Sequence, residues 1–156
     1  LLAFALGIII GAGLVSIFTD NHRHTDDHSH YDDDVHVHAD FAIYINDQKI
    51  ELSEDKFQSS AEQILHKNVH LHDGEDHVVH RHAEDVTFVE FLSSLGFSIT
   101  DNCLATDSGE SYCSDEENEL VLYVNKEKVS MDNYIPQEED RLLLYFGTPN
   151  NQNIQT

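Results

Sequence analysis

Three short stretches of this chain each place two histidines two residues apart. They read His36-Val37-His38, His70-Leu71-His72 and His80-Arg81-His82. Successive side chains of an extended strand point to opposite faces, so each pair would share one face of a sheet. Residues 35–45 alternate between apolar side chains and a second row that contains His36 and His38, which is typical of a half-buried strand. The pattern predicts a sheet with one face in the core and histidines on the other.

The remaining strands follow from the same alternation and from turn residues. In chain order, strands are predicted over residues 35–45, 49–52, 69–72, 77–83, 120–125, 128–129 and 141–146. Asn46-Asp47-Gln48 and Asp73-Gly74 supply the turns of two hairpins. Residues 123–129 repeat the residue pattern of residues 44–50, which predicts a second hairpin of the same kind. The last strand is apolar enough to lie in the centre of a sheet.

One helix is marked at both ends. Thr87 and Glu90 form a Ser/Thr-x-x-Glu capping box, apolar residues recur with helical spacing up to Leu95, and Gly96 supplies the stop. The acidic segment that follows lacks apolar periodicity and is predicted to be irregular. These elements together predict an α+β domain over residues 35–147, an antiparallel, β-rich domain with one main helix in a β-grasp-like arrangement. Residues 148–156 are predicted to be a polar tail.

An apolar segment precedes this domain. Residues 1–18 carry no charged side chain and as a helix would span about 27 Å, close to the ~30 Å hydrocarbon core of a bilayer. We therefore predict a single-pass transmembrane anchor over residues 1–19, with a retained signal segment as the alternative. The flank that follows the segment is acidic, which favours a domain outside the cytoplasm at the cell membrane.

Two further predictions concern the N-terminal region. Residues 20–34 are rich in histidine and aspartate, with almost no apolar content, and predict a flexible tether that captures metal ions loosely or acts as a spacer. Ala3, Gly7 and Gly11 recur every four residues in the apolar segment. Such a face of small residues permits close helix pairing, so a homodimer is one expectation.

The chain is strongly acidic and contains two cysteines. Lysine and arginine total 8 against 30 aspartates and glutamates, which gives a formal net charge of −22. Nucleic acids and anionic membrane surfaces carry the same sign, so the charge argues against both as partners and favours cations. Cys103 and Cys113 are separated by nine residues, unlike a Cys-x-x-Cys redox pair. They predict a structural disulfide in an extracytoplasmic domain.

The paired histidines are the predicted metal ligands, namely His36, His38, His70, His72, His80 and His82. Imidazole suits Zn²⁺ and Cu²⁺, and two imidazoles at positions i and i+2 of a strand can reach one ion. Acidic residues and histidines nearby are candidates for further ligands or for orienting the imidazoles, namely Asp40, His66, Asp73, His77 and Glu84. A polar or pH-responsive histidine face is the alternative. The sequence leaves open whether the three pairs form one site or two.

No established catalytic motif accompanies these histidines. The sequence contains no His-Glu-x-x-His, no nucleophile elbow and no phosphate-binding glycine loop. The expected function is capture, buffering or sensing of Zn²⁺ or Cu²⁺ at the cell surface. A hydrolytic or redox metalloenzyme that uses the same histidines is one alternative, and a structural or pH-responsive surface protein is another.

Four stretches carry a resemblance to a known family, namely residues 36–41, 70–74, 80–96 and 134–147. Through them the chain resembles an uncharacterised family of short, single-pass, histidine-rich surface proteins of metagenomic bacteria and archaea. Some members are labelled protein-disulfide isomerases, and this chain has no Cys-x-x-Cys motif to match that label. The resemblance implies an extracytoplasmic domain behind a membrane anchor and supplies no mechanism.

Overall fold

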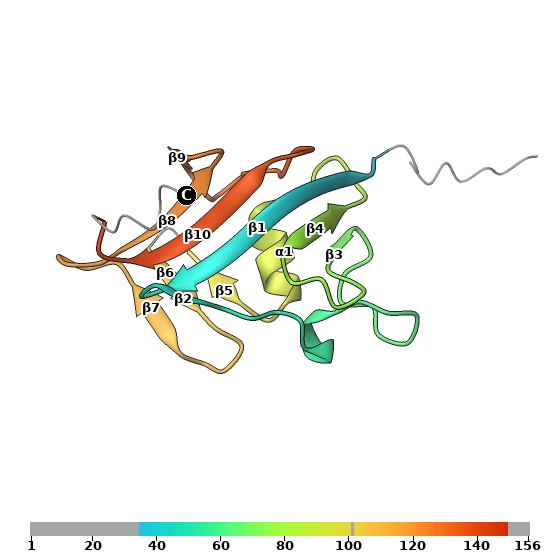
Figure 1. Cartoon of the computed structure of the whole chain (residues 1–156), viewed down its shortest axis with the longest axis horizontal. Coiled ribbons are helices and arrows are strands. Elements are labelled where there is room, and N and C mark those ends of the chain that lie inside the picture. Colours follow the sequence, from blue (N-terminus) through green and yellow to red (C-terminus); the bar gives the residue numbers. More distant parts are fainter. Residues whose placement is uncertain (1–34, 101, 150–156) are drawn as a thin grey trace, which may run out of the picture.

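The computed structural model describes residues 35–100 and 102–149, which are mostly β-structure with one α-helix (Figure 1). The predicted anchor at residues 1–19, the tether at residues 20–34 and the tail from residue 150 onward lie outside the described residues. Ala3, Gly7 and Gly11 lie outside them as well. Within residues 35–100 and 102–149, no helix combines the length and the apolar character that crossing a membrane requires.

The main sheet has the strand order β3-β4-β1-β10-β8-β9, with β2 added beside β1 (Figure 1). Its strands are β1 (Val37–Ile45), β2 (Gln48–Lys49), β3 (Val69–His70), β4 (Val78–Arg81), β8 (Glu119–Val124), β9 (Glu127–Val129) and β10 (Arg141–Gly147). The alternation predicted for residues 35–45 is confirmed, because Ala39, Phe41 and Ile43 are buried on one face of β1. The opposite face of β1 begins with the histidines.

One strand pairing differs from the predicted antiparallel sheet. The first strand, β1, and the last strand, β10, lie side by side and run parallel. Parallel neighbours need a long connection, and here nearly the whole domain lies between the two strands. The prediction that β10 is central is confirmed, because it lies between β1 and β8. The sheet is therefore mixed, with its longest strands in the middle.

Two hairpins of the main sheet share one turn geometry. Asn46 and Asp47 have φ angles of 48° and 67°, and Asn125 and Lys126 have φ angles of 52° and 73°. Positive φ at both central residues defines the tight turn that matches the twist of two antiparallel strands. Asparagine tolerates this conformation better than most residues, which explains the asparagine at the start of both turns. The matching φ angles confirm the prediction of two equivalent hairpins.

Helix α1 (Phe88–Ser94) packs its apolar side onto the core face of the sheet (Figure 1). The predicted capping box is present, since the Thr87 side chain accepts the backbone N–H of Glu90 and the Glu90 carboxylate accepts the backbone N–H of Thr87. Phe91 is fully buried, and its ring meets that of Phe41 edge-on at 4.9 Å between centroids. A helix this short depends on such packing for its stability.

The segment predicted to be irregular contains a second, smaller sheet. It has three strands, β5 (Ser98–Ile99), β6 (Cys103–Ala105) and β7 (Ser111–Cys113), in that order. Periodicity fails to reveal strands of two or three residues, and only Leu104 is fully buried in them. The remaining regular element is a short 3₁₀ helix, η1 (Asp55–Phe57).

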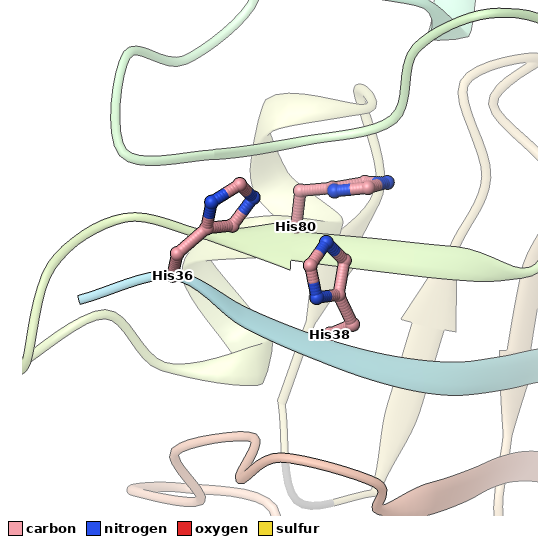
Figure 2. Close-up of side chains that lie close together, drawn as sticks. All are labelled: His36, His38 and His80. Atoms are coloured by element: carbon pink, nitrogen blue, oxygen red, sulfur yellow. The ribbon is translucent and has the colours of Figure 1, made fainter.

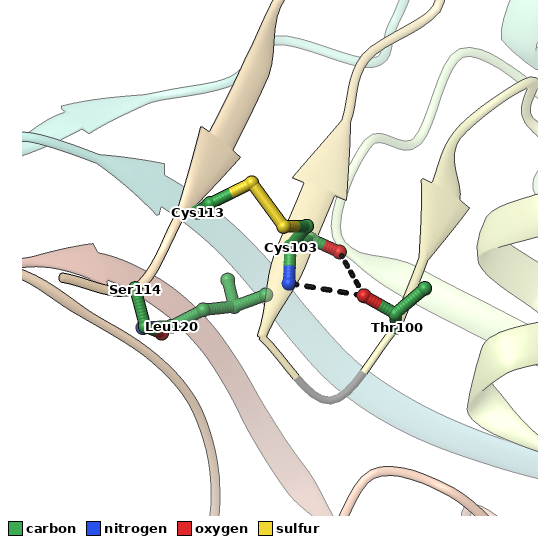
Figure 3. The surroundings of a disulfide bond; sticks show 5 residues. All are labelled: Thr100, Cys103, Cys113, Ser114 and Leu120. Carbon is green, nitrogen blue, oxygen red and sulfur yellow. Dashed lines mark hydrogen bonds between the residues drawn. A yellow bond between two sulfur atoms is a disulfide. The ribbon is translucent and has the colours of Figure 1, made fainter.

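The predicted disulfide joins Cys103 to Cys113, which face each other across β6 and β7 (Figure 3). The Thr100 hydroxyl accepts the backbone N–H of Cys103 at 3.2 Å and fixes the start of β6. The bridge therefore joins the first residue of β6 to the last residue of β7.

Removing this bridge is expected to lower the free energy of unfolding by about 2–3 kcal/mol, because the unfolded chain regains the freedom of the closed loop. Urea unfolding of a variant with Cys103→Ser and Cys113→Ser measures the loss. The unaltered protein in excess reductant is the matched control and should unfold at the same urea concentration as the variant. Equal stability of the oxidised protein and the variant would contradict the expected role of the bridge.

Candidate metal centre

The register of three neighbouring strands aligns histidines in one row. Strand β4 lies between β1 and β3, and His80 on β4 is paired with His38 on β1 and with His70 on β3. Paired residues of adjacent strands point to the same face, so these three side chains leave the sheet on the side opposite α1. The first histidine pair therefore lies beside the other two.

All six predicted ligands lie in one group, the histidine cluster, which consists of His36, His38, His70, His72, His80 and His82. On the β1 side, the ring centroid of His36 is 4.6 Å from those of both His38 and His82. The centroid of His38 is 4.7 Å from that of His80. Alternation along each strand brings residues i and i+2 to the same face, which explains why both members of each pair are present.

The β3 side continues this group without a gap. The ring centroid of His72 is 4.0 Å from that of His80, and the centroid of His70 is 5.0 Å from that of His82. The two rings of the β3 pair, His70 and His72, have centroids 5.6 Å apart. The cluster therefore extends over all three strands.

Three members of the cluster bring ligand atoms close enough to hold one metal ion. One ring nitrogen from each of His36, His38 and His80 lies within 4.8 Å of the others (Figure 2). His36 is exposed, His38 is half-buried and His80 is buried. This triad could therefore bind an ion at the edge of the cluster that faces solvent.

His80 is the most unusual side chain of the triad. It is 6% exposed, and within the described part of the chain neither of its ring nitrogens has a hydrogen-bond partner. A buried polar atom without a partner is costly by about 1–3 kcal/mol. Burial first, and then the neighbouring imidazoles of His72 and His38, lower the pKa of His80 to about 4. The ring is therefore neutral at neutral pH and offers a lone pair, as a metal ligand must.

Two of the predicted supporting residues contact the β3 pair. The Nδ1 atom of His70 lies 3.3 Å from the carbonyl oxygen of His66, and the Nδ1 atom of His72 lies 2.7 Å from the Asp73 carboxylate. The pKa of His70 is lowered, mainly by burial, and burial lowers that of His82 in the same way. His66 and Asp73 are thus placed to orient imidazoles of the cluster.

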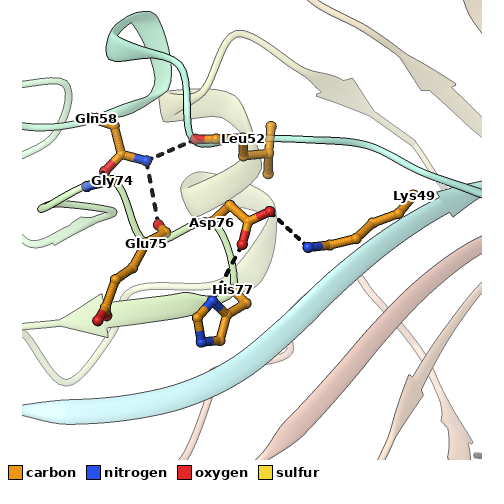
Figure 4. Close-up of polar contacts among 7 residues, drawn as sticks. All are labelled: Lys49, Leu52, Gln58, Gly74, Glu75, Asp76 and His77. Carbon is orange, nitrogen blue, oxygen red and sulfur yellow. Dashed lines mark hydrogen bonds and ion pairs between the residues drawn. The ribbon is translucent and has the colours of Figure 1, made fainter.

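Among the described residues, the other three predicted supporting residues do not belong to the group whose ligand atoms come together. Asp40 follows His38 on the same face of β1, but its strand neighbours are Val78 and Arg141. The His77 ring is paired with Asp76 at 3.3 Å (Figure 4).

Glu84 lies just after the cluster and contacts the opposite side of the sheet. Its backbone carbonyl accepts a hydrogen bond from Arg81, whose side chain is buried on the core side of β4 and also donates to the Pro136 carbonyl at 2.9 Å. The arginine between His80 and His82 therefore holds β4 against the loop before β10.

One residue near the triad is not foreseen from the sequence. The Glu138 carboxylate accepts the backbone N–H of His38 at 2.8 Å and lies 3.9 Å from the Nδ1 atom of the same residue. Glu138 is 100 positions away in the chain and comes to His38 only through the parallel pairing of β1 with β10. In the sequence, Glu138 is recognisable only as part of a polar turn before the last strand.

A buried aspartate fixes the loop that carries Glu138. Asp140 accepts hydrogen bonds from the Asn125 side chain and the backbone N–H of Gln137, both at 2.8 Å, and from the Tyr134 hydroxyl. Burial and the Asp140 carboxylate both raise the pKa of Tyr134. The loop before β10 is therefore held rigidly against the hairpin of β8 and β9.

A buried glutamine fixes the loop between β3 and β4, which carries His72. The Gln58 side chain donates to the carbonyl oxygens of Leu52 at 2.7 Å and Glu75 at 3.3 Å, and it accepts the backbone N–H of Gly74 at 3.1 Å (Figure 4). In the same loop Asp76 forms an ion pair with Lys49 at 2.7 Å.

Replacing Gln58 with leucine is expected to lower the free energy of unfolding by about 1–3 kcal/mol, because buried backbone groups lose their partners while the volume stays filled. Chemical denaturation followed by circular dichroism measures the change. The matched control is Gln48→Leu on exposed β2, for which we expect a change within about 0.5 kcal/mol. Equal effects at the two positions would contradict a structural role for the buried side chain.

Comparison with known proteins identifies no relative for this fold and site: no family model, curated protein or solved structure matches the chain.

Proposed function

We propose that this chain is a membrane-anchored, extracytoplasmic protein that captures, buffers or senses a divalent transition metal through its histidine cluster. The observation that carries the proposal is His80, a buried imidazole beside His36 and His38 whose two nitrogens lack hydrogen-bond partners among the described residues. Bound metal would satisfy a nitrogen that is otherwise left without a hydrogen bond. A purely polar face gives no reason for burying such a group.

The donor atoms favour Zn²⁺ or Cu²⁺. The triad offers only imidazole nitrogens, which both ions accept readily. Both cysteines are joined in the disulfide and are therefore not available as thiolate ligands. Three protein ligands leave room for a fourth, and the nearby Glu138 carboxylate or a water molecule suits that position.

The sequence and the disulfide support the proposed location. An apolar segment of anchor length followed by an acidic flank favours an extracytoplasmic domain, and disulfides persist chiefly in oxidising compartments. The net charge of −22 attracts cations to the domain. The resemblance to single-pass surface proteins points the same way, and we propose membership of that family on those grounds.

Elemental analysis of the purified protein after growth with added zinc or copper tests the proposal. We expect at least one equivalent of metal and a rise in melting temperature on adding Zn²⁺ to the stripped protein, because an ion bound only by the folded state stabilises it. A variant with His36→Ala and His38→Ala should lose most of this shift. The matched control has His22→Ala and His24→Ala in the tether and should keep it. No bound metal and no shift, or equal losses in both variants, would overturn the proposal.

A metalloenzyme is the second candidate, and one observation favours it. A groove of about 680 Å³ on the outer face of the sheet is lined by His38, Asp40 and Glu138 together with Tyr123 and Arg141. A three-histidine site with an open position beside a groove is the arrangement in which a bound water can react. A change in the visible spectrum of the Co²⁺-loaded protein on adding azide would favour the enzyme, and an unchanged spectrum would favour simple binding.

A further inference from the structure

We infer that the histidine cluster holds a second metal ion, bound by the Nε2 atoms of His70 and His72 with His82 as the third imidazole. This inference rests on the proposed metal-binding function and adds a second position beside the triad of His36, His38 and His80.

The hydrogen bonds of the β3 pair select the atoms that would bind. A carbonyl oxygen and a carboxylate only accept hydrogen bonds, so the Nδ1 atoms of His70 and His72 must carry the proton toward His66 and Asp73. In a neutral imidazole this leaves the lone pair on Nε2. A carbonyl or carboxylate that fixes the far nitrogen is the usual support of a metal-binding histidine.

The spacing of the rings fits a shared ion. With a Zn–N bond of about 2.1 Å, two imidazoles around one tetrahedral ion have ring centroids about 5 Å apart. The centroid of His70 lies 5.0 Å from that of His82 and 5.6 Å from that of His72. These two distances equal or slightly exceed the expected value. Among the described residues only the triad has its ligand atoms within 4.8 Å of one another, so the side chains of His70, His72 and His82 must rotate to close the second site.

One ion cannot serve the whole cluster. Strands β1 and β3 are separated by β4, so their backbones lie about 10 Å apart. Among the described residues, the ligand atoms that lie within 4.8 Å of one another belong to His36, His38 and His80, so the triad as it stands does not include the pair on β3. Six imidazoles also exceed the four ligands of a tetrahedral ion. The triad uses three of the six, which leaves His70, His72 and His82 for a second ion.

The second position would exchange its ion more readily than the first. The His72 side chain is 35% exposed and that of Asp73 is 84% exposed, whereas the triad includes the buried His80. The Asp73 carboxylate and the acidic chain offset the repulsion between two cations. The chemistry again selects Zn²⁺ or Cu²⁺, because the ligands are imidazole nitrogens.

Calorimetric titration with Zn²⁺ tests the inference. The background protein carries alanine in place of the four tether histidines, so that they contribute no binding, namely His22, His24, His28 and His30. We expect two equivalents in this protein and one in a variant with His70→Gln and His72→Gln. The variant with His36→Ala and His38→Ala should keep one weaker equivalent. Circular dichroism verifies that each variant is folded.

The results separate this inference from the proposed function. One equivalent in the background protein, kept in the His70→Gln, His72→Gln variant and lost with His36 and His38, would overturn the second site and leave the proposed function intact. No binding in any protein would overturn both. Loading the background protein with two equivalents of Cu²⁺ gives an independent reading, since two adjacent ions should produce a dipole-coupled paramagnetic spectrum. A spectrum of isolated Cu²⁺ would contradict the inference.

Discussion

Replacing His80 with leucine is expected to change metal binding and stability in opposite directions. The variant should bind Zn²⁺ at least about 100-fold more weakly, because the loss of orienting groups around a metal ligand alone costs about 10–100-fold. In the absence of metal, its free energy of unfolding should rise by about 1–3 kcal/mol, since leucine fills a similar volume and removes two buried nitrogens that have no partner in the described part of the chain.

Two measurements on the same samples check this expectation. Competition with a chromogenic chelator gives the affinity for Zn²⁺, and urea unfolding at pH 7 in the presence of EDTA gives the stability without metal. The matched control is His77→Leu, which alters an exposed ring just before β4. It should leave affinity unchanged and stability within about 0.5 kcal/mol. A less stable His80→Leu protein that still binds Zn²⁺ normally would mean that His80 is an ordinary core residue.

Weaker Zn²⁺ binding combined with higher stability of the metal-free protein distinguishes a binding site from a structural core. A buried histidine that belonged to the core would have hydrogen-bond partners, and its loss would destabilise the protein. Natural sites often keep a group that is unfavourable in the empty protein because the ligand makes it favourable. His80 fits this description, since its neighbours are other imidazoles and its pKa is strongly lowered by burial.

The histidine face could be predicted from the sequence because strand alternation is a local property. Phe41 and Ile43 identify the core side of β1, so His36 and His38 must point away from it. The capping box at Thr87 and the turns at Asn46 and Asn125 are likewise local, and the structure contains them as predicted. Each depends on residues within a few positions of one another.

Long-range pairing accounts for what the sequence did not reveal. No local pattern indicates that β1 pairs in parallel with β10, and this pairing alone brings Glu138 to His38. The burial of His80 also depends on tertiary structure, because it results from rings contributed by both neighbouring strands. The register of β3, β4 and β1 decides that His70, His80 and His38 form one row, and a shift of one residue would turn them to opposite faces.

Acidifying the metal-free protein from pH 7 to pH 4 is expected to lower its free energy of unfolding by about 3 kcal/mol through His80 alone. The pKa of this ring falls from 6.5 to about 4 on folding. Between these values the unfolded chain holds a proton here that the folded protein does not, so unfolding takes up a proton and becomes easier as the pH falls. Above pH 6.5 the ring is neutral in both states and has no effect. His70 and His82, whose pKa values are also lowered, act in the same direction.

Urea unfolding at several pH values, with EDTA present, isolates this effect when the protein is compared with His80→Leu. The pKa values of Asp76 and Glu90 are lowered by their hydrogen bonds, so these carboxylates also destabilise the fold in acid, and they do so equally in both proteins. For each protein, the free energy of unfolding is plotted against pH. The difference between the two curves is therefore due to His80 and its coupling to the other rings. Parallel curves would show that the ring is protonated as easily in the folded state as in the unfolded state. Saturating Zn²⁺ should steepen the loss of stability in acid more in the protein that retains His80 than in His80→Leu, because protons and the ion then also compete for the nitrogens of the triad.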